Sequence, residues 1–96
     1  MPDEIVRVHV WVKGLVQNVG FRAHVELNAR QLSVTGWVRN VGYDTVEALA
    51  EGEREKVDRF IETMKAGPGA SRVHESRVEW ENATGEFAEF GVKRSM

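Results

Sequence analysis

In the segment IVRVHVWVK at positions 5–13, near the start of the chain, apolar side chains alternate with polar or aromatic ones without a break from Val6 onward. The apolar positions are Val6, Val8, Val10 and Val12, and the positions between them are Arg7, His9, Trp11 and Lys13. Successive side chains of a β-strand point to opposite faces, so this alternation predicts a strand with a buried valine face and a face open to water. Other elements of the chain must then cover the valines.

Two later segments have the apolar spacing of amphipathic helices. The first carries Phe21, Val25, Ala29 and Leu32, and the second, within residues 53–65, carries Val57, Phe60, Ile61 and Met64. Strands are predicted at residues 33–41, 44–52 and 72–81, with a short strand within residues 86–94. The run AGPGAS at residues 66–71 predicts a turn before the last pair of strands.

The predicted order is β-α-β-β-α-β with an extra short strand at the C-terminal end. Short connections and right-handed crossovers leave few arrangements for this order. The simplest is an α/β structure of the α+β kind, a ferredoxin-like sandwich in which two helices cover one face of a mostly antiparallel sheet. A length of 96 residues suits one domain, residues 1–96, with one core.

Composition narrows the functional classes. The chain has no cysteine, which excludes disulfides and thiolate zinc sites, and its three histidines share no ligand spacing, so no metal or other cofactor is expected. The formal net charge of −2 favours neither nucleic acid nor an anionic membrane as a partner. No segment has the apolar length of a membrane span, and MPDEIV does not resemble a signal peptide, so a cytoplasmic location is expected.

The loop GLVQNVGFR, residues 14–22, stands where the first strand gives way to the first helix. No Ser, Thr or Asp immediately precedes Phe21 to cap the helix, and a glycine loop with converging N–H groups at a helix start can bind an anion. The helix dipole disfavours a cation in the first turn, yet the planar guanidinium of Arg22 suits paired hydrogen bonds to phosphate oxygens. The alternative is a simple turn followed by a solvated arginine.

Two separated blocks of the chain resemble the acylphosphatase family in one register. GLVQNVGFR is similar to the family signature Gly-x-Val-Gln-Gly-Val-Gly-Phe-Arg, and GWVRN at residues 36–40 with VEALAEGE at 46–53 is similar to its second conserved block. The GPGAS turn and the TGEF run near the end also match the family layout. The resemblance covers nearly the whole chain. It implies a ferredoxin-like monomer that hydrolyses carboxyl–phosphate anhydrides to a carboxylate and inorganic phosphate, without a metal or a phosphoenzyme.

The resemblance also implies roles for particular residues. Arg22 would bind the phosphate, and Asn40 would orient the attacking water. The loop backbone would share the phosphate, through Leu15, Val16, Gln17, Asn18, Val19, Gly20 and Phe21. The leaving carboxylate is a weak base that needs no general acid, so positioning and electrostatic stabilisation can supply most of the catalysis. From the residues alone, Asn40 is also explained as a turn residue at a strand end.

Two positions depart from the family pattern. Asn18 stands where the family usually has glycine, and because Asn tolerates a left-handed backbone, we expect the loop to keep its shape. Its amide could compete with phosphate for the free N–H groups or donate to the phosphate, and the sequence leaves both open. The run VGYDT after Asn40 replaces a common Asp-Gly turn and could change the aim of the Asn40 side chain.

Two alternative functions remain at this point. One is a catalytically weakened anion-binding domain, if Asn18 blocks the site. The other is RNA binding, because the polar and aromatic face of residues 5–13, with Trp37 and Arg39 beside it, could stack bases. The acidic net charge argues against RNA, and so do Glu47 and Glu51 on the same face, one of which we expect to pair with Arg39. Nothing in the sequence selects the acyl group, so carbamoyl, acetyl and bisphosphoglycerate-type acyl phosphates are all compatible.

Overall fold

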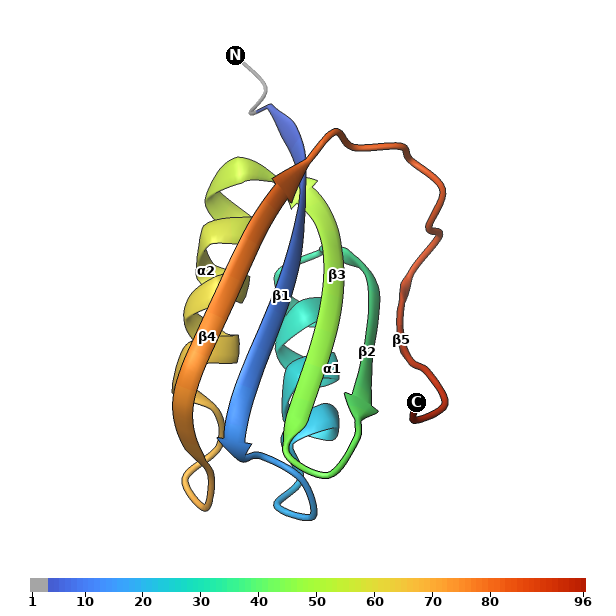
Figure 1. The fold of residues 1–96 in the computed structure, drawn as a ribbon. Coiled ribbons are helices and arrows are strands. Elements are labelled where there is room, and N and C mark those ends of the chain that lie inside the picture. The colour runs from blue at the N-terminus through green and yellow to red at the C-terminus, as the bar shows by residue number, and fades with distance from the viewer. Residues whose placement is uncertain (1–3) are drawn as a thin grey trace.

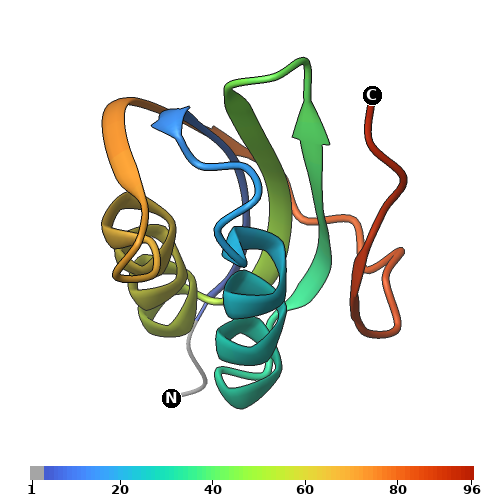
Figure 2. The same cartoon turned by 90° about the horizontal axis from the view of Figure 1, so that it is seen from below.

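The structure, a computed structural model, describes residues 4–96. Its strands are β1 (Ile5–Leu15), β2 (Thr35–Val41), β3 (Thr45–Glu53), β4 (Arg72–Glu81) and β5 (Phe90–Val92), and its helices are α1 (Phe21–Gln31) and α2 (Arg54–Ala66). The strands form one sheet in the order β4-β1-β3-β2-β5, in which only the β2–β5 pair is parallel among the described strands (Figure 1). Both helices lie on one face of the sheet (Figure 2). The predicted ferredoxin-like sandwich is confirmed.

The core lies between the sheet and the two helices. Val8, Val10 and Val12 of β1 are fully buried there, which confirms the predicted valine face. The helices contribute Phe21, Val25, Ala29, Val57, Phe60, Ile61 and Met64. The side chain of Phe90 fixes β5 to this core, because its ring lies 5.6 Å from the ring of Phe60.

Several element boundaries differ from the sequence prediction, among them the end of β1, which extends to Leu15. The second strand begins at Thr35 because Ser33 has a left-handed backbone (φ 60°) and Val34 still donates to the Ala29 carbonyl at the end of α1. The last strand covers only residues 90–92 of the predicted 86–94. The residues before it cross the sheet instead of pairing along its edge.

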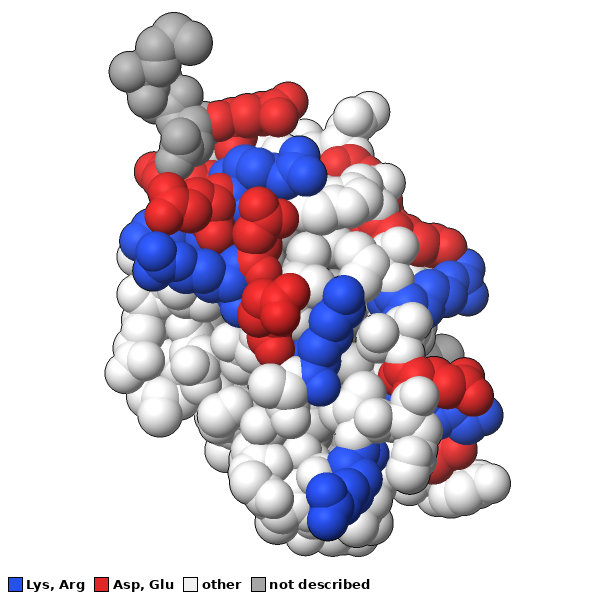
Figure 3. All heavy atoms as spheres, turned by 90° about the vertical axis from the view of Figure 1, so that its left-hand side faces the viewer, with Lys and Arg blue, Asp and Glu red and all other residues white. Residues whose placement is uncertain are grey.

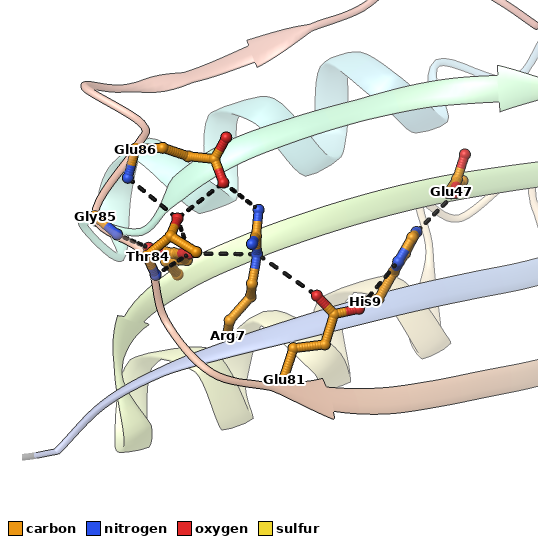
Figure 4. A network of polar contacts seen from close by, with 8 residues as sticks. Arg7, His9, Glu47, Glu81, Thr84, Gly85 and Glu86 are labelled. Atoms are coloured by element: carbon orange, nitrogen blue, oxygen red, sulfur yellow. Dashed lines mark hydrogen bonds and ion pairs between the residues drawn. The ribbon is translucent and has the colours of Figure 1, made fainter.

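The second face of the sheet is only partly open, which corrects the prediction: the Lys13 side chain is 54% exposed, but those of Arg7 and His9 are 12% and 20% exposed. The chain between β4 and β5 passes over one end of this face, where Thr84, Gly85 and Glu86 lie beside Arg7 (Figure 4). It caps the Glu51 carboxylate. The backbone N–H groups of Thr84 and Gly85 each donate to the Glu51 carboxylate at 2.9 Å, and Arg7 Nε lies 3.2 Å from Glu51 Oε2. The side chains of Glu51 and Arg7 are 3% and 12% exposed. The alternation of side chains in β1 could not reveal this cover, because the covering residues lie far along the chain, between β4 and β5.

A second carboxylate on the same face, Glu47, is also paired. Arg39 Nε donates to Glu47 Oε1 at 2.6 Å, which confirms the predicted partner, and His9 Nε2 lies 2.6 Å from Glu47 Oε2. Burial raises the pKa of Glu47, but the hydrogen bonds and charges of Arg39 and His9 outweigh it, so the pKa lies below the ordinary value of 4.5.

These contacts occupy the side chains that an RNA site on this face would use. His9 stacks on Trp11 at 3.8 Å, and the Arg77 guanidinium lies 4.8 Å from the Trp11 ring centroid. Arg39 and Lys93 lie 4.8 Å and 4.6 Å from the Trp37 ring. Base stacking needs an accessible aromatic face, so this arrangement does not favour the RNA alternative.

Candidate active site

The loop between β1 and α1 is shaped by left-handed backbone conformations. Asn18 has φ 62°, as its tolerance of this conformation led us to expect, and Gly20 has φ 76°. Gly20 is the N-cap residue of α1, yet no side chain caps the helix and its first turn contains no acidic residue. The first N–H groups of a helix have no partner within the helix. The start of α1 therefore presents free donors and the positive end of the helix dipole.

Shortly before the loop, at Gly14 near the end of β1, the pairing of β1 with β4 contains a bulge. Gly14 has φ 144°, and a Cβ atom there would lie 2.2 Å from the carbonyl oxygen of Arg72. Only glycine fits so close to the neighbouring strand at this bulge.

Arg22 and Asn40 line one pocket of about 310 Å³ at the N-terminal end of α1. Asn40 follows the buried Val38 by two residues in β2, so both side chains lie on the helix side, whereas Arg39 is on the opposite face. The other lining residues are Val16, Gln17, Asn18, Gly20, Phe21, Ala23, Glu26 and Val92. The lining does not include two of the predicted loop residues: the Leu15 side chain is 55% exposed to solvent, and Val19 packs against the core.

Gln17 fastens this loop to the β2–β3 hairpin. Its Nε2 donates to the carbonyl oxygens of Val41, Gly42 and Thr45 at 3.4, 3.2 and 3.0 Å. The hairpin follows directly after Asn40, so these bonds hold Asn40 in place relative to the loop. The altered VGYDT run therefore still forms a hairpin that is tied to the loop.

The C-terminal residues form another wall of the pocket. Val92 lines it, and Arg22 Nη1 donates to Ser95 Oγ at 3.4 Å. Backbone hydrogen bonds from Lys93 to Val38 and from Met96 to Asn40, at 2.8 and 2.9 Å, continue the β5–β2 pairing beyond β5. Sequence reasoning missed Val92 and Ser95, and no local signal marks them, because their position depends on long-range packing.

Sequence reasoning also missed Glu26, which lines the pocket one helical turn after Arg22. Here a signal was available, since residues four apart lie on the same face of a helix. In contrast, His9, His24 and His74 lie on β1, α1 and β4 and line no part of this pocket.

The pocket combines features suited to a phosphoryl group. Free N–H donors and a guanidinium favour a dianion, and a guanidinium makes strong, directional bonds to phosphate oxygens. The neutral amide of Asn40 can both donate and accept, so it can orient water without adding a negative charge.

Comparisons with known proteins agree with this geometry. A family model described as Acylphosphatase matches residues 8–92. The chain is 46% identical over 90 residues to the acylphosphatase of Anaeromyxobacter sp. (strain Fw109-5), covering 94% of this chain and 97% of the relative. It is 42% identical over 89 residues to that of Roseiflexus sp. (strain RS-1), covering 93% and 96%. The crystal structure of the Bacillus subtilis acylphosphatase superimposes with a TM-score of 0.87 at 32% identity, covering 92% of this chain and 98% of that one. The chain belongs to the acylphosphatase family.

Proposed function

We propose that this chain hydrolyses the carboxyl–phosphate bond of acyl phosphates in the pocket shared by Arg22 and Asn40. The observation that carries the proposal is that Arg22, at the start of α1, and Asn40, near the end of β2, line the same pocket. The products are a carboxylate and inorganic phosphate, and the reaction uses no metal or other cofactor.

The phosphoryl group binds between the loop backbone and Arg22. The free N–H groups at the start of α1 point toward bound oxygens, and the guanidinium closes over the same group. The transition state spreads negative charge over the phosphoryl oxygens, so fixed donors stabilise it without reorganisation. A bound dianion also compensates the unfavourable position of Arg22 in its own helix.

Asn40 orients the attacking water in line with the leaving group. The leaving carboxylate is a weak base, so no side chain has to protonate it, and the water passes its proton to the phosphoryl group. An aspartate at this position could act as a base but would repel the dianion. The neutral amide is therefore the better residue type for this task.

The test is hydrolysis of benzoyl phosphate in the presence of a chelator. We expect turnover by the wild type and a loss of about 10²–10³ in kcat for each of Arg22→Ala and Asn40→Ala, the usual cost of removing one such donor. Arg59→Ala, on the exposed surface of α2, and Asn82→Ala, after β4, are matched controls that should retain activity. Wild-type hydrolysis no faster than in buffer would contradict the proposal.

We further propose that residues 1–96 act as one domain and as a monomer in the cytoplasm, with no nucleic-acid partner. Figure 3, which faces the β4 side of the molecule, shows acidic and basic side chains interspersed there. Mixed charges on an edge strand oppose its pairing with a second copy, and no single-sign patch of that face is large enough to attract nucleic acid. No helix in residues 4–96 has the length and apolar character to cross a membrane.

A further inference from the structure

Glu26 is the acidic side chain of the pocket lining, and the reaction proposed above gives it no task. It follows Arg22 by one turn of α1 and is 33% exposed. A carboxylate beside an anion site weakens the binding of a dianion by like-charge repulsion. Its presence in this lining therefore indicates a role other than holding the phosphoryl group.

The Glu26 carboxylate is held in position without being neutralised. Arg30 Nη2 lies 3.4 Å from Glu26 Oε2 and also donates to the Phe90 carbonyl at 3.0 Å. Arg30 is 54% exposed, and an exposed ion pair at this distance is weak and screened by salt. Much of the negative charge of Glu26 therefore still acts on the pocket.

We propose that Glu26 is a specificity-determining residue that selects acyl phosphates by the charge of their acyl group. The inference rests on the proposed function, because the phosphoryl group and the water occupy the loop, Arg22 and Asn40. The acyl group is then left with the remaining lining, Ala23, Glu26 and Val92. There a carboxylate accepts hydrogen bonds from N–H donors and repels a second anion. The favoured substrates are acyl phosphates whose acyl group is uncharged or carries N–H groups, and the disfavoured ones carry a carboxylate or a second phosphate.

The test compares three small substrates at low ionic strength: acetyl phosphate, carbamoyl phosphate and succinyl phosphate. In the wild type we expect kcat/KM for succinyl phosphate to be about three- to tenfold below that for acetyl phosphate, as expected for one partly screened like charge. Glu26→Gln should remove most of this difference by lowering the KM for succinyl phosphate. It should also lower the preference for carbamoyl phosphate over acetyl phosphate. Added salt should likewise reduce the difference in kcat/KM between acetyl phosphate and succinyl phosphate in the wild type.

Glu62→Gln is the matched control, because it removes the same charge from an exposed position on α2, outside the lining. It should leave the substrate ratios unchanged. Unchanged ratios in Glu26→Gln would overturn the selectivity while leaving the hydrolase intact. An equal fall in kcat for all three substrates with a changed pH profile would also overturn it, since Glu26 would then be a general base. Wild type inactive on all three substrates would overturn the proposed function itself.

Discussion

The side chain of Arg22 stands in the first turn of α1, where Gly20 leaves the backbone donors uncapped and no acidic residue accompanies it. In the absence of a ligand, these positive groups repel one another, and the Ser95 hydroxyl is an uncharged partner for the guanidinium. A residue that conflicts with the preferences of its own helix often indicates a functional site. The unfavourable position of a cation at the start of the helix was visible in the sequence, whereas the hydrogen bond from Arg22 to Ser95 was not.

Asn18 is the residue of the loop whose side chain can affect phosphate binding most directly. It lines the pocket, and about 310 Å³ of space remains with its amide in place, so we expect it to assist the phosphate and not to obstruct it. Asn18→Gly should weaken competitive inhibition by inorganic phosphate about fivefold, which is the effect of one hydrogen bond of about 1 kcal/mol. The measurement is the inhibition constant of phosphate in the benzoyl phosphate assay.

The thermal midpoint is the control for this substitution. Glycine relieves the cost of the left-handed backbone at position 18, about 1 kcal/mol, so the midpoint should not fall. Tighter inhibition by phosphate in Asn18→Gly would show instead that the asparagine occupies part of the phosphate site.

At the scale of elements, we expect the proposed active site to depend on how firmly the loop is joined to the β2–β3 hairpin. Gln17→Ala removes an NH2 group whose two hydrogens are shared among three hairpin carbonyls, and leaves those carbonyls without that donor. We expect a loss of about 1–2 kcal/mol in the free energy of unfolding and a fall in kcat, because Asn40 is then less well aimed. Denaturant unfolding and steady-state kinetics of the same preparation check both effects.

The matched control is Gln31→Ala, at the exposed end of α1. It should change neither quantity. If Gln17→Ala lowered stability but left kcat unchanged, the bonds from Gln17 would support the fold without aiming Asn40.

The elements that the sequence predicted well are those whose burial follows their own periodicity. The valine face of β1 and the apolar stripe of α2 are local patterns, and both lie in the core as expected. Residues 82–96 behave differently, because β5 is three residues long and its position comes from the parallel pairing with β2 and from Phe90. Such long-range contacts have no local periodicity, so neither the cover over Glu51 nor the Val92 wall of the pocket could be predicted.

At the scale of the whole molecule, the buried carboxylates make stability depend on pH. Burial raises the pKa of Glu51, but hydrogen bonds from Thr84 and Gly85, together with the charge of Arg7, outweigh it and hold the pKa below 4.5. The pKa of Glu47 is lowered in the same way. A carboxylate with a lowered folded pKa contributes stability above its unfolded pKa, and this contribution is lost as pH falls through the folded value.

We therefore expect the free energy of unfolding to be constant near neutrality and to decline as pH falls below 4.5. Glu51→Gln should be less stable than the wild type at pH 7 by about 1–3 kcal/mol, because charged hydrogen bonds are replaced, and the gap should narrow in acid. Denaturant unfolding at several pH values measures the decline in wild-type stability and the gap between the wild type and Glu51→Gln. Glu75→Gln, on the exposed part of β4, is the control. A gap that stayed constant down to low pH would contradict this assignment.

The stretch from Thr84 to Met96 contacts Glu51 on one face of the sheet, then pairs along the edge of β2 and supplies Val92 to the pocket. The stretch lies at the edge of the sheet and is held there by its pairing with β2 and by the buried Phe90, so we expect it to detach as one unit while the rest stays folded. When it detaches, Glu51 loses its donors and the pocket loses its Val92 wall in the same event. We therefore expect the amide protons of Lys93 and Met96 to exchange through the same opening that releases the cover over Glu51.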